Sequence, residues 1–133
     1  DSVKAWNELT PAFGIKFNQD KHYEDPLTGV ASNGLTTQAV RKIGCWAGSS
    51  LTVSGAAKAE FTFNSQNGGQ PFVATSTHGT GRVVAIGDSS PFDDGTGAPG
   101  DNLHDGYKQH DIPQFGLNAV NWLSGKAHEA VDR

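Results

Sequence analysis

One segment constrains the fold of this chain more than any other. Residues 83–86 read Val-Val-Ala-Ile and are followed directly by Gly87 and Asp88. A short, continuous apolar run that ends in turn residues is typical of a strand buried on both faces of a sheet. Such strands belong to α/β folds, in which other layers cover both faces. The run therefore predicts an interior strand of a mixed sheet.

Weaker patterns predict the neighbouring strands. Residues 57–63 alternate apolar and polar side chains, and the turn Asn67-Gly68-Gly69 joins them to residues 71–77, which predicts an antiparallel hairpin. Residues 18–33 are polar and rich in turn formers, which predicts a loop. Three further strands are expected at residues 13–17, 40–46 and 51–53.

Both ends of the chain have helical spacing. Residues 2–9 place Val3, Trp6 and Leu9 on one face, and we expect the tryptophan in the core. Residues 112–123 are apolar on one face, begin after a capping Asp111 and end at Ser124-Gly125. The order of helix, strands, loop and helix predicts an α/β fold, with a mixed sheet and flanking helices.

The length of 133 residues fits a single domain spanning residues 1–133. No apolar run approaches about 18 residues, so no membrane span is expected. The chain contains no methionine and begins with Asp1, which predicts a piece excised from a longer product. The single cysteine, Cys45, cannot form an internal disulfide, and we expect a buried, inert thiol.

The negative charge of the chain, −4 in total, is concentrated in one stretch. Between residues 88 and 111 the single base Lys108 faces six acids, which are Asp88, Asp93, Asp94, Asp101, Asp105 and Asp111. This balance excludes nucleic acid as a partner there, because phosphates attract lysine and arginine. It favours a cation or a polar ligand held by carboxylates.

The acidic stretch follows the predicted buried strand directly. Ligands of open α/β sheets bind beyond the carboxyl ends of strands, which places Asp88 well. Carboxylate oxygens suit calcium, so the predicted metal ligands are Asp88, Asp93, Asp94 and Asp101. Ser89 and Asn102 join these four residues in the predicted site for a polar ligand. The alternative is a solvated loop whose carboxylates cap its own turns.

Two short motifs in the same stretch resemble the GDS and DxxH blocks of SGNH esterases. They are Gly87-Asp88-Ser89 and Asp101-Asn102-Leu103-His104. The resemblance implies Ser89 as nucleophile, His104 as base and Asp101 as its orienting acid. In that family the two blocks lie at opposite ends of the domain, whereas here they are close together. A hydrolase, with this triad or a metal-assisted water, is therefore an alternative function.

Longer stretches resemble another family. Gly-Thr-Gly-Arg-Val-Val-Ala-Ile-Gly-Asp-Ser-Ser of residues 79–90 and Leu-Asn-Ala-Val-Asn-Trp-Leu of residues 117–123 resemble the C-terminal part of class I glutamine-amidotransferase-like domains. Residues 6–15, 47–56 and 93–97 resemble the non-catalytic subgroup found in large secreted bacterial proteins. The catalytic cysteine and His-x-Glu pair of amidotransferases have no counterparts here, which argues against an enzyme.

This resemblance implies a flavodoxin-like three-layer fold that lacks its N-terminal βαβ part. It also implies a bacterial parent protein that is secreted or displayed at the cell surface and carries other domains. We therefore expect a non-catalytic module that binds calcium or a polar ligand, such as a glycan, or a neighbouring domain. A structural fragment that completes its sheet with another chain or with its missing half is the remaining alternative.

Overall fold

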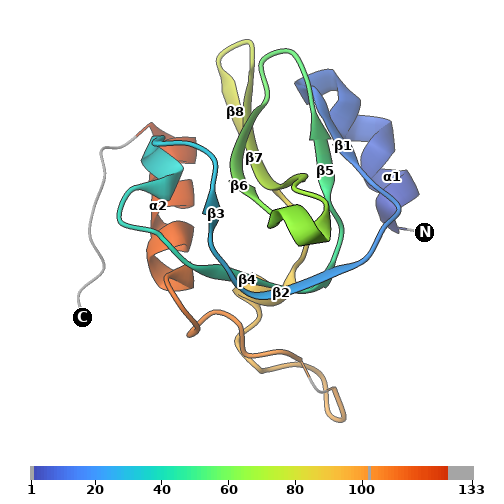
Figure 1. Cartoon of the computed structure of the whole chain (residues 1–133), viewed down its shortest axis with the longest axis vertical. Coiled ribbons are helices and arrows are strands. Elements are labelled where there is room, and N and C mark those ends of the chain that lie inside the picture. Colours follow the sequence, from blue (N-terminus) through green and yellow to red (C-terminus); the bar gives the residue numbers. More distant parts are fainter. Residues whose placement is uncertain (1, 102, 126–133) are drawn as a thin grey trace.

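The computed structural model describes residues 2–101 and 103–125 of the chain. Within them the fold combines two α-helices with three small sheets, and every strand pair is antiparallel. Figure 1 shows the helices at opposite sides of the molecule with the strands between them. The α/β class predicted from the sequence is therefore confirmed, but the predicted mixed sheet is wrong, because no strand pair among the described residues is parallel.

The largest sheet has four strands in the order β3-β6-β7-β8. These strands are β3 (Gly29–Val30), β6 (Lys58–Thr62), β7 (Pro71–His78) and β8 (Gly81–Ile86). The short turn Gly79-Thr80 joins the last two, with His78 opposite Gly81. Glycine is suited to this turn because its backbone has a φ of +59°. The two hairpins confirm the predictions for residues 57–63 and 71–77.

Two strand pairs surround this sheet. One joins β1 (Ile15–Phe17) to β5 (Leu51–Val53), and the other joins β2 (His22–Leu27) to β4 (Ile43–Gly48). In Figure 1 the second pair runs below the main sheet, and the acidic loop extends away from the body beneath it. Short 3-10 turns connect the strands: η1 (Thr10–Phe13), η2 (Leu35–Thr37), η3 (Ser65–Asn67) and η4 (Ser90–Phe92).

The helices are α1 (Ser2–Leu9) and α2 (Ile112–Ser124). Gly125 ends α2 in the left-handed conformation, with φ of 74°, as the sequence predicted. Asp111 is the N-cap residue of α2, as the sequence predicted, but its side chain makes no cap hydrogen bond. Its Oδ2 instead accepts from the backbone N–H groups of Arg41 and Lys42, at 2.9 and 3.0 Å.

The hydrophobic core has two parts, one on each face of the main sheet. On the α2 face, Phe61, Phe72 and Phe115 belong to a cluster that Val84 and Ile86 join from β8. On the other face, Ile15 and Leu51 pack with Ala85, and Val83 joins them. Successive side chains of β8 therefore point into different core clusters.

Two expectations about strands are wrong, and the first is the loop at residues 18–33. Residues 18–33 are not a loop, because β2 and β3 lie within them. The pattern of β2 is hard to detect because most of its residues are not buried and its pairing with β4 contains two register shifts.

Residues 83–86 do form a strand, but it is not interior. Among the described strands β8 pairs with β7 alone, and Val83, Val84 and Ile86 are only partly buried. The apolar run arises because the two faces of β8 meet two different core clusters. Both faces of a strand can be buried while one of its edges has no neighbouring strand. The apolar pattern of the sequence indicates only that the faces are covered.

Candidate functional site

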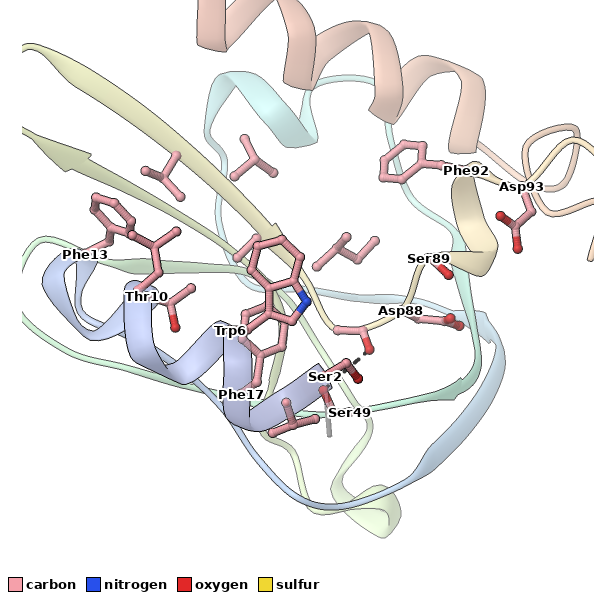
Figure 2. A pocket seen from close by; sticks show the side chains of 17 residues that line it. Ser2, Trp6, Thr10, Phe13, Phe17, Ser49, Asp88, Ser89, Phe92 and Asp93 are labelled. Atoms are coloured by element: carbon pink, nitrogen blue, oxygen red, sulfur yellow. Dashed lines mark hydrogen bonds between the residues drawn. The ribbon is translucent and has the colours of Figure 1, made fainter.

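A groove of about 690 Å³ runs beside the outer part of β8. Apolar side chains of α1 form one wall, residues 83–88 form its floor, and Phe92 of η4 stands at its far side. Figure 2 shows Trp6 on the α1 side and Phe92 across from it. The ring of Phe92 stacks on Phe115 of α2, with centroids 6.0 Å apart, which links the groove to the core.

The apolar face of α1 lines this groove instead of the core. Trp6 is 55% exposed and Leu9 is 56% exposed, so the expectation of a core tryptophan is wrong. Asn7 fixes the helix against β1: its Nδ2 donates to the Phe17 carbonyl and its Oδ1 accepts from the Phe17 N–H, both at 2.8 Å. The hydrogen bonds hold α1 in place without burying its apolar face.

One edge of β8 faces this region without a partner strand among the described residues. The N–H of Gly87 donates to the carbonyl of Phe72 on β7, at 3.0 Å. Because hydrogen-bonding directions alternate along an antiparallel strand, the backbone groups of Arg82, Val84 and Ile86 point away from β7. No strand in the described part of the chain pairs with them.

Thr10 adds a polar group to the groove lining. The residue is only 6% exposed, and its Oγ1 has no hydrogen-bond partner among the described residues. A buried hydroxyl without a partner costs roughly 1–3 kcal/mol.

The carboxyl end of β8 is fixed to β4 by backbone contacts. The N–H of Ser49 donates to the Gly87 carbonyl at 2.8 Å. Asp88, predicted as a metal ligand, has both carboxylate oxygens engaged: Oδ2 accepts from the N–H of Trp46 at 2.7 Å and Oδ1 from the N–H of Ser90 at 3.0 Å. Asp88 therefore positions the start of the acidic loop.

The other predicted metal ligands are dispersed along the loop. Asp94 Oδ1 accepts from the side chain and backbone of Thr96, and these hydrogen bonds lower the pKa of Asp94. Asp101 Oδ2 accepts from the N–H of Ala98 at 3.0 Å. Asp93 lines the groove, and Asn102 lies outside the described residues.

Within the described part of the chain, no three carboxylate, imidazole or thiol groups gather to hold a metal. Asp94 and Asp101 cap turns of their own loop, as the alternative interpretation of the acidic stretch expected. The described structure thus supplies no preformed calcium site, and calcium binding stays a prediction.

Each residue of the predicted esterase triad has surroundings of its own. Ser89 is exposed at the end of the groove, and the imidazole of His104 lies against Trp46 with centroids 4.2 Å apart. His104 Nε2 is 3.2 Å from Gln109 Nε2. Among the described residues no hydrogen bond joins any two of Ser89, Asp101 and His104, so the arrangement lacks the contacts of a nucleophile, base and acid.

Sequence reasoning missed a polar cluster where the acidic loop returns to the body. His110 Nε2 lies 2.5 Å from Asp25 Oδ1, and the indole N–H of Trp46 donates to Asp25 Oδ2 at 3.0 Å. Desolvation of Asp25 opposes these contacts, but together they lower the pKa of its carboxyl. The three residues are far apart in the sequence, and no motif joins them.

Cys45 is buried, as the sequence predicted. Burial raises the pKa of its thiol to about 12. The thiolate, which is the nucleophile, is therefore scarce at neutral pH, and the site offers no cysteine chemistry.

Comparisons with known proteins identify no relatives for this chain. No family model matches it, and neither a curated protein nor a solved structure matches it significantly. Among the described residues, neither helix has the length and apolar character needed to cross a bilayer.

Proposed function

We propose that this chain is a non-catalytic binding module that accepts an extended polypeptide segment in the groove beside β8. The observation that carries this proposal is the open edge of β8, whose backbone groups at Arg82, Val84 and Ile86 face away from β7. Strand addition to such an edge supplies main-chain hydrogen bonds, while side-chain pockets supply specificity.

The groove provides the side-chain part of this recognition. Trp6 and Leu9 present a partly exposed apolar surface, and Phe92 stands across from them. A strand laid along β8 would place alternate side chains against these residues. It would also cover the exposed apolar surface of Trp6 and Leu9, and the gain is roughly 25 cal/mol per Å² of surface covered.

The resemblance to amidotransferase-like domains suggests which segment this is. In a flavodoxin-like three-layer domain, strands of the N-terminal βαβ part would continue the sheet beyond β8. We propose that this part, or a neighbouring domain of the same exported bacterial protein, supplies the strand. Location outside the cell, as a secreted or cell-surface protein, belongs to the same proposal and rests on the same resemblance.

A second candidate is a polar ligand, such as a glycan, or a calcium ion at the end of the groove. The observation that favours it is that Asp88, Ser89 and Asp93 all line this end, where Ser89 is exposed. This is the weaker candidate, because no three carboxylate, imidazole or thiol groups gather there among the described residues.

Selection from displayed random peptides about ten residues long tests the main proposal, since strands of this size are common. We expect enriched peptides that alternate β-branched or aromatic residues with polar ones. They should bind the native chain and quench or shift its tryptophan fluorescence, to which Trp6, Trp46 and Trp122 all contribute. Binding should be lost in Val84→Pro, because proline removes an N–H that faces the open edge.

The matched control is Tyr23→Ser. Tyr23 is a 66% exposed aromatic residue outside the groove lining, so its loss should leave peptide binding unchanged. Failure to enrich any peptide, or equal binding by Val84→Pro, would show that the edge of β8 is not a binding site.

A further inference from the structure

We infer that, when no other segment occupies it, the open edge of β8 pairs antiparallel with β8 of a second copy of this chain. The inference rests on the proposed function, because it uses the same edge and groove. It goes further by naming a partner, a register and an oligomeric state. Three features of the edge carry it: hydrogen-bonding direction, charge and the position of α1.

Hydrogen bonding sets the possible registers. The outward backbone groups are at Arg82, Val84 and Ile86, so these positions must lie opposite outward positions of the second copy. A two-fold axis beside Ala85 satisfies this condition. It places Val84 opposite Ile86 of the second copy, and the reverse pair follows by symmetry.

Charge favours this register. Arg82 is exposed at the start of β8, and Asp88 follows the end of the strand. The two-fold axis that pairs Val84 with Ile86 also places Arg82 opposite Asp88 of the second copy, at both ends of the joined strands. A parallel pairing in register would instead bring like charges together, which is destabilising.

Both charged groups keep hydrogen-bonding capacity for this contact. Arg82 Nη1 donates to the Trp122 carbonyl at 2.5 Å, which leaves other guanidinium donors for a carboxylate. Each oxygen of Asp88 accepts one backbone N–H, and a carboxylate has lone pairs for more. The contact therefore adds to the existing hydrogen bonds and does not replace them.

The position of α1 gives the pairing a hydrophobic component. A two-fold axis perpendicular to the sheet keeps α1 of both copies on the same face. The exposed Trp6 and Leu9 of one copy then approach those of the other above the joined strands. An isologous contact of this kind is self-complementary and closes at the dimer.

Sedimentation velocity of the full chain at about 1 to 100 μM tests the inference, a range in which weak homodimers dissociate. We expect a monomer–dimer equilibrium for the native chain. Val84→Pro and Trp6→Glu should each raise the dimer dissociation constant at least about tenfold, which corresponds to 1.4 kcal/mol. Arg82→Glu should do the same, because it places two acids opposite each other.

The controls are Tyr23→Ser and Arg41→Glu, which change an exposed aromatic and an exposed base away from the groove. Both should dimerise like the native chain. Circular dichroism verifies folding, and Trp6→Glu keeps the test valid if Val84→Pro does not fold.

The outcomes separate the two proposals. A native chain that is monomeric throughout this range but still binds selected peptides overturns the dimer and leaves the strand-accepting function intact. A chain that neither dimerises nor binds peptides overturns both. A dimer that Val84→Pro, Trp6→Glu and Arg82→Glu leave unchanged has another interface, which also overturns the inference.

Discussion

Gly87 lies where β8 ends against β4, and the space for a side chain there is filled by backbone. A Cβ atom on Gly87 would lie 1.9 Å from the Ser49 carbonyl oxygen. We therefore expect Gly87→Ala to lower the free energy of unfolding by about 3 kcal/mol, since the crowding atom is backbone and cannot rotate away. Urea denaturation measures the change.

The matched control for this substitution is Gly116→Ala in α2. A Cβ there would meet only Phe92, at an ordinary contact distance of 3.5 Å. Alanine is the better helix former, so this variant should be as stable as the native chain or more stable, by up to about 1 kcal/mol. Equal stability of Gly87→Ala and the native chain would contradict the close packing at β8.

Cys45 should be unreactive in the folded protein. Burial raises the pKa of its thiol to about 12, so the thiolate fraction is about a thousandfold below that of an exposed cysteine. A thiol-reactive disulfide reagent at pH 8 should label the unfolded chain within minutes and leave the folded chain unlabelled over the same time. Rapid, complete labelling of the folded chain would show that the residue is accessible and activated.

The contacts of Asp25 with His110 and Trp46 should make stability depend on pH. The pKa of Asp25 is lowered in the folded state, so its contribution is present above the pKa of an unfolded aspartate, about 3.9. It is lost as the pH falls through the lower, folded value. Asp25→Asn should cost about 1 kcal/mol at pH 7, after allowing for partial exposure.

The stability difference between Asp25→Asn and the native chain should shrink by pH 3, as the native carboxyl approaches protonation. Asp105→Asn serves as the control because Asp105 pairs with Lys108 at an exposed position. It should change stability little at either pH. Urea midpoints at the two pH values provide the measurement, and a constant difference for Asp25→Asn would be inconsistent with a titrating contact.

At the scale of elements, sequence patterns best predict the helices and strands that have a single apolar face. The amphipathic residues 57–63 and 112–123 each have one apolar face, and both form the expected strand and helix. The prediction of an interior strand at residues 83–86 is wrong, because the two faces of this strand meet two core clusters while no described strand pairs with one of its edges. The pattern of apolar and polar residues along a strand indicates which of its faces are covered, but it does not indicate whether its edges are paired.

The same limit applies to the candidate site. The sequence located the end of β8 and the acidic loop, since both are continuous in the chain. It missed the groove, because the face formed by Val3, Trp6 and Leu9 has the spacing of a core helix whether or not another layer covers it. The contact between Asp25 and His110 was also unpredictable, because only the fold brings these residues together.

The acidic loop is the element on which a calcium prediction can be decided. The carboxylates of Asp94 and Asp101 accept hydrogen bonds from groups of their own loop. Calcium would therefore have to rearrange the loop in order to bind. If the second candidate function holds, the melting temperature is higher in millimolar calcium than in millimolar magnesium or in chelator, and equal melting temperatures would remove the calcium site. A calcium-specific rise would demonstrate a site by mass action, at about 2.7 kcal/mol for a concentration of 100 Kd.

At the scale of the whole molecule, dimerisation through β8 would couple stability to protein concentration. If the native dimer unfolds to two separate chains, each tenfold rise in concentration stabilises it by RT ln 10, about 1.4 kcal/mol per dimer. For a chain of this size the melting temperature should rise by about 2–3 °C per tenfold step.

Val84→Pro should melt at a temperature that does not depend on concentration, because its N–H toward the second copy is gone. Calorimetry over a hundredfold concentration range tests this, with Tyr23→Ser expected to follow the native chain. A native melting temperature that stays constant across that range would mean that folding and association are not coupled at this edge.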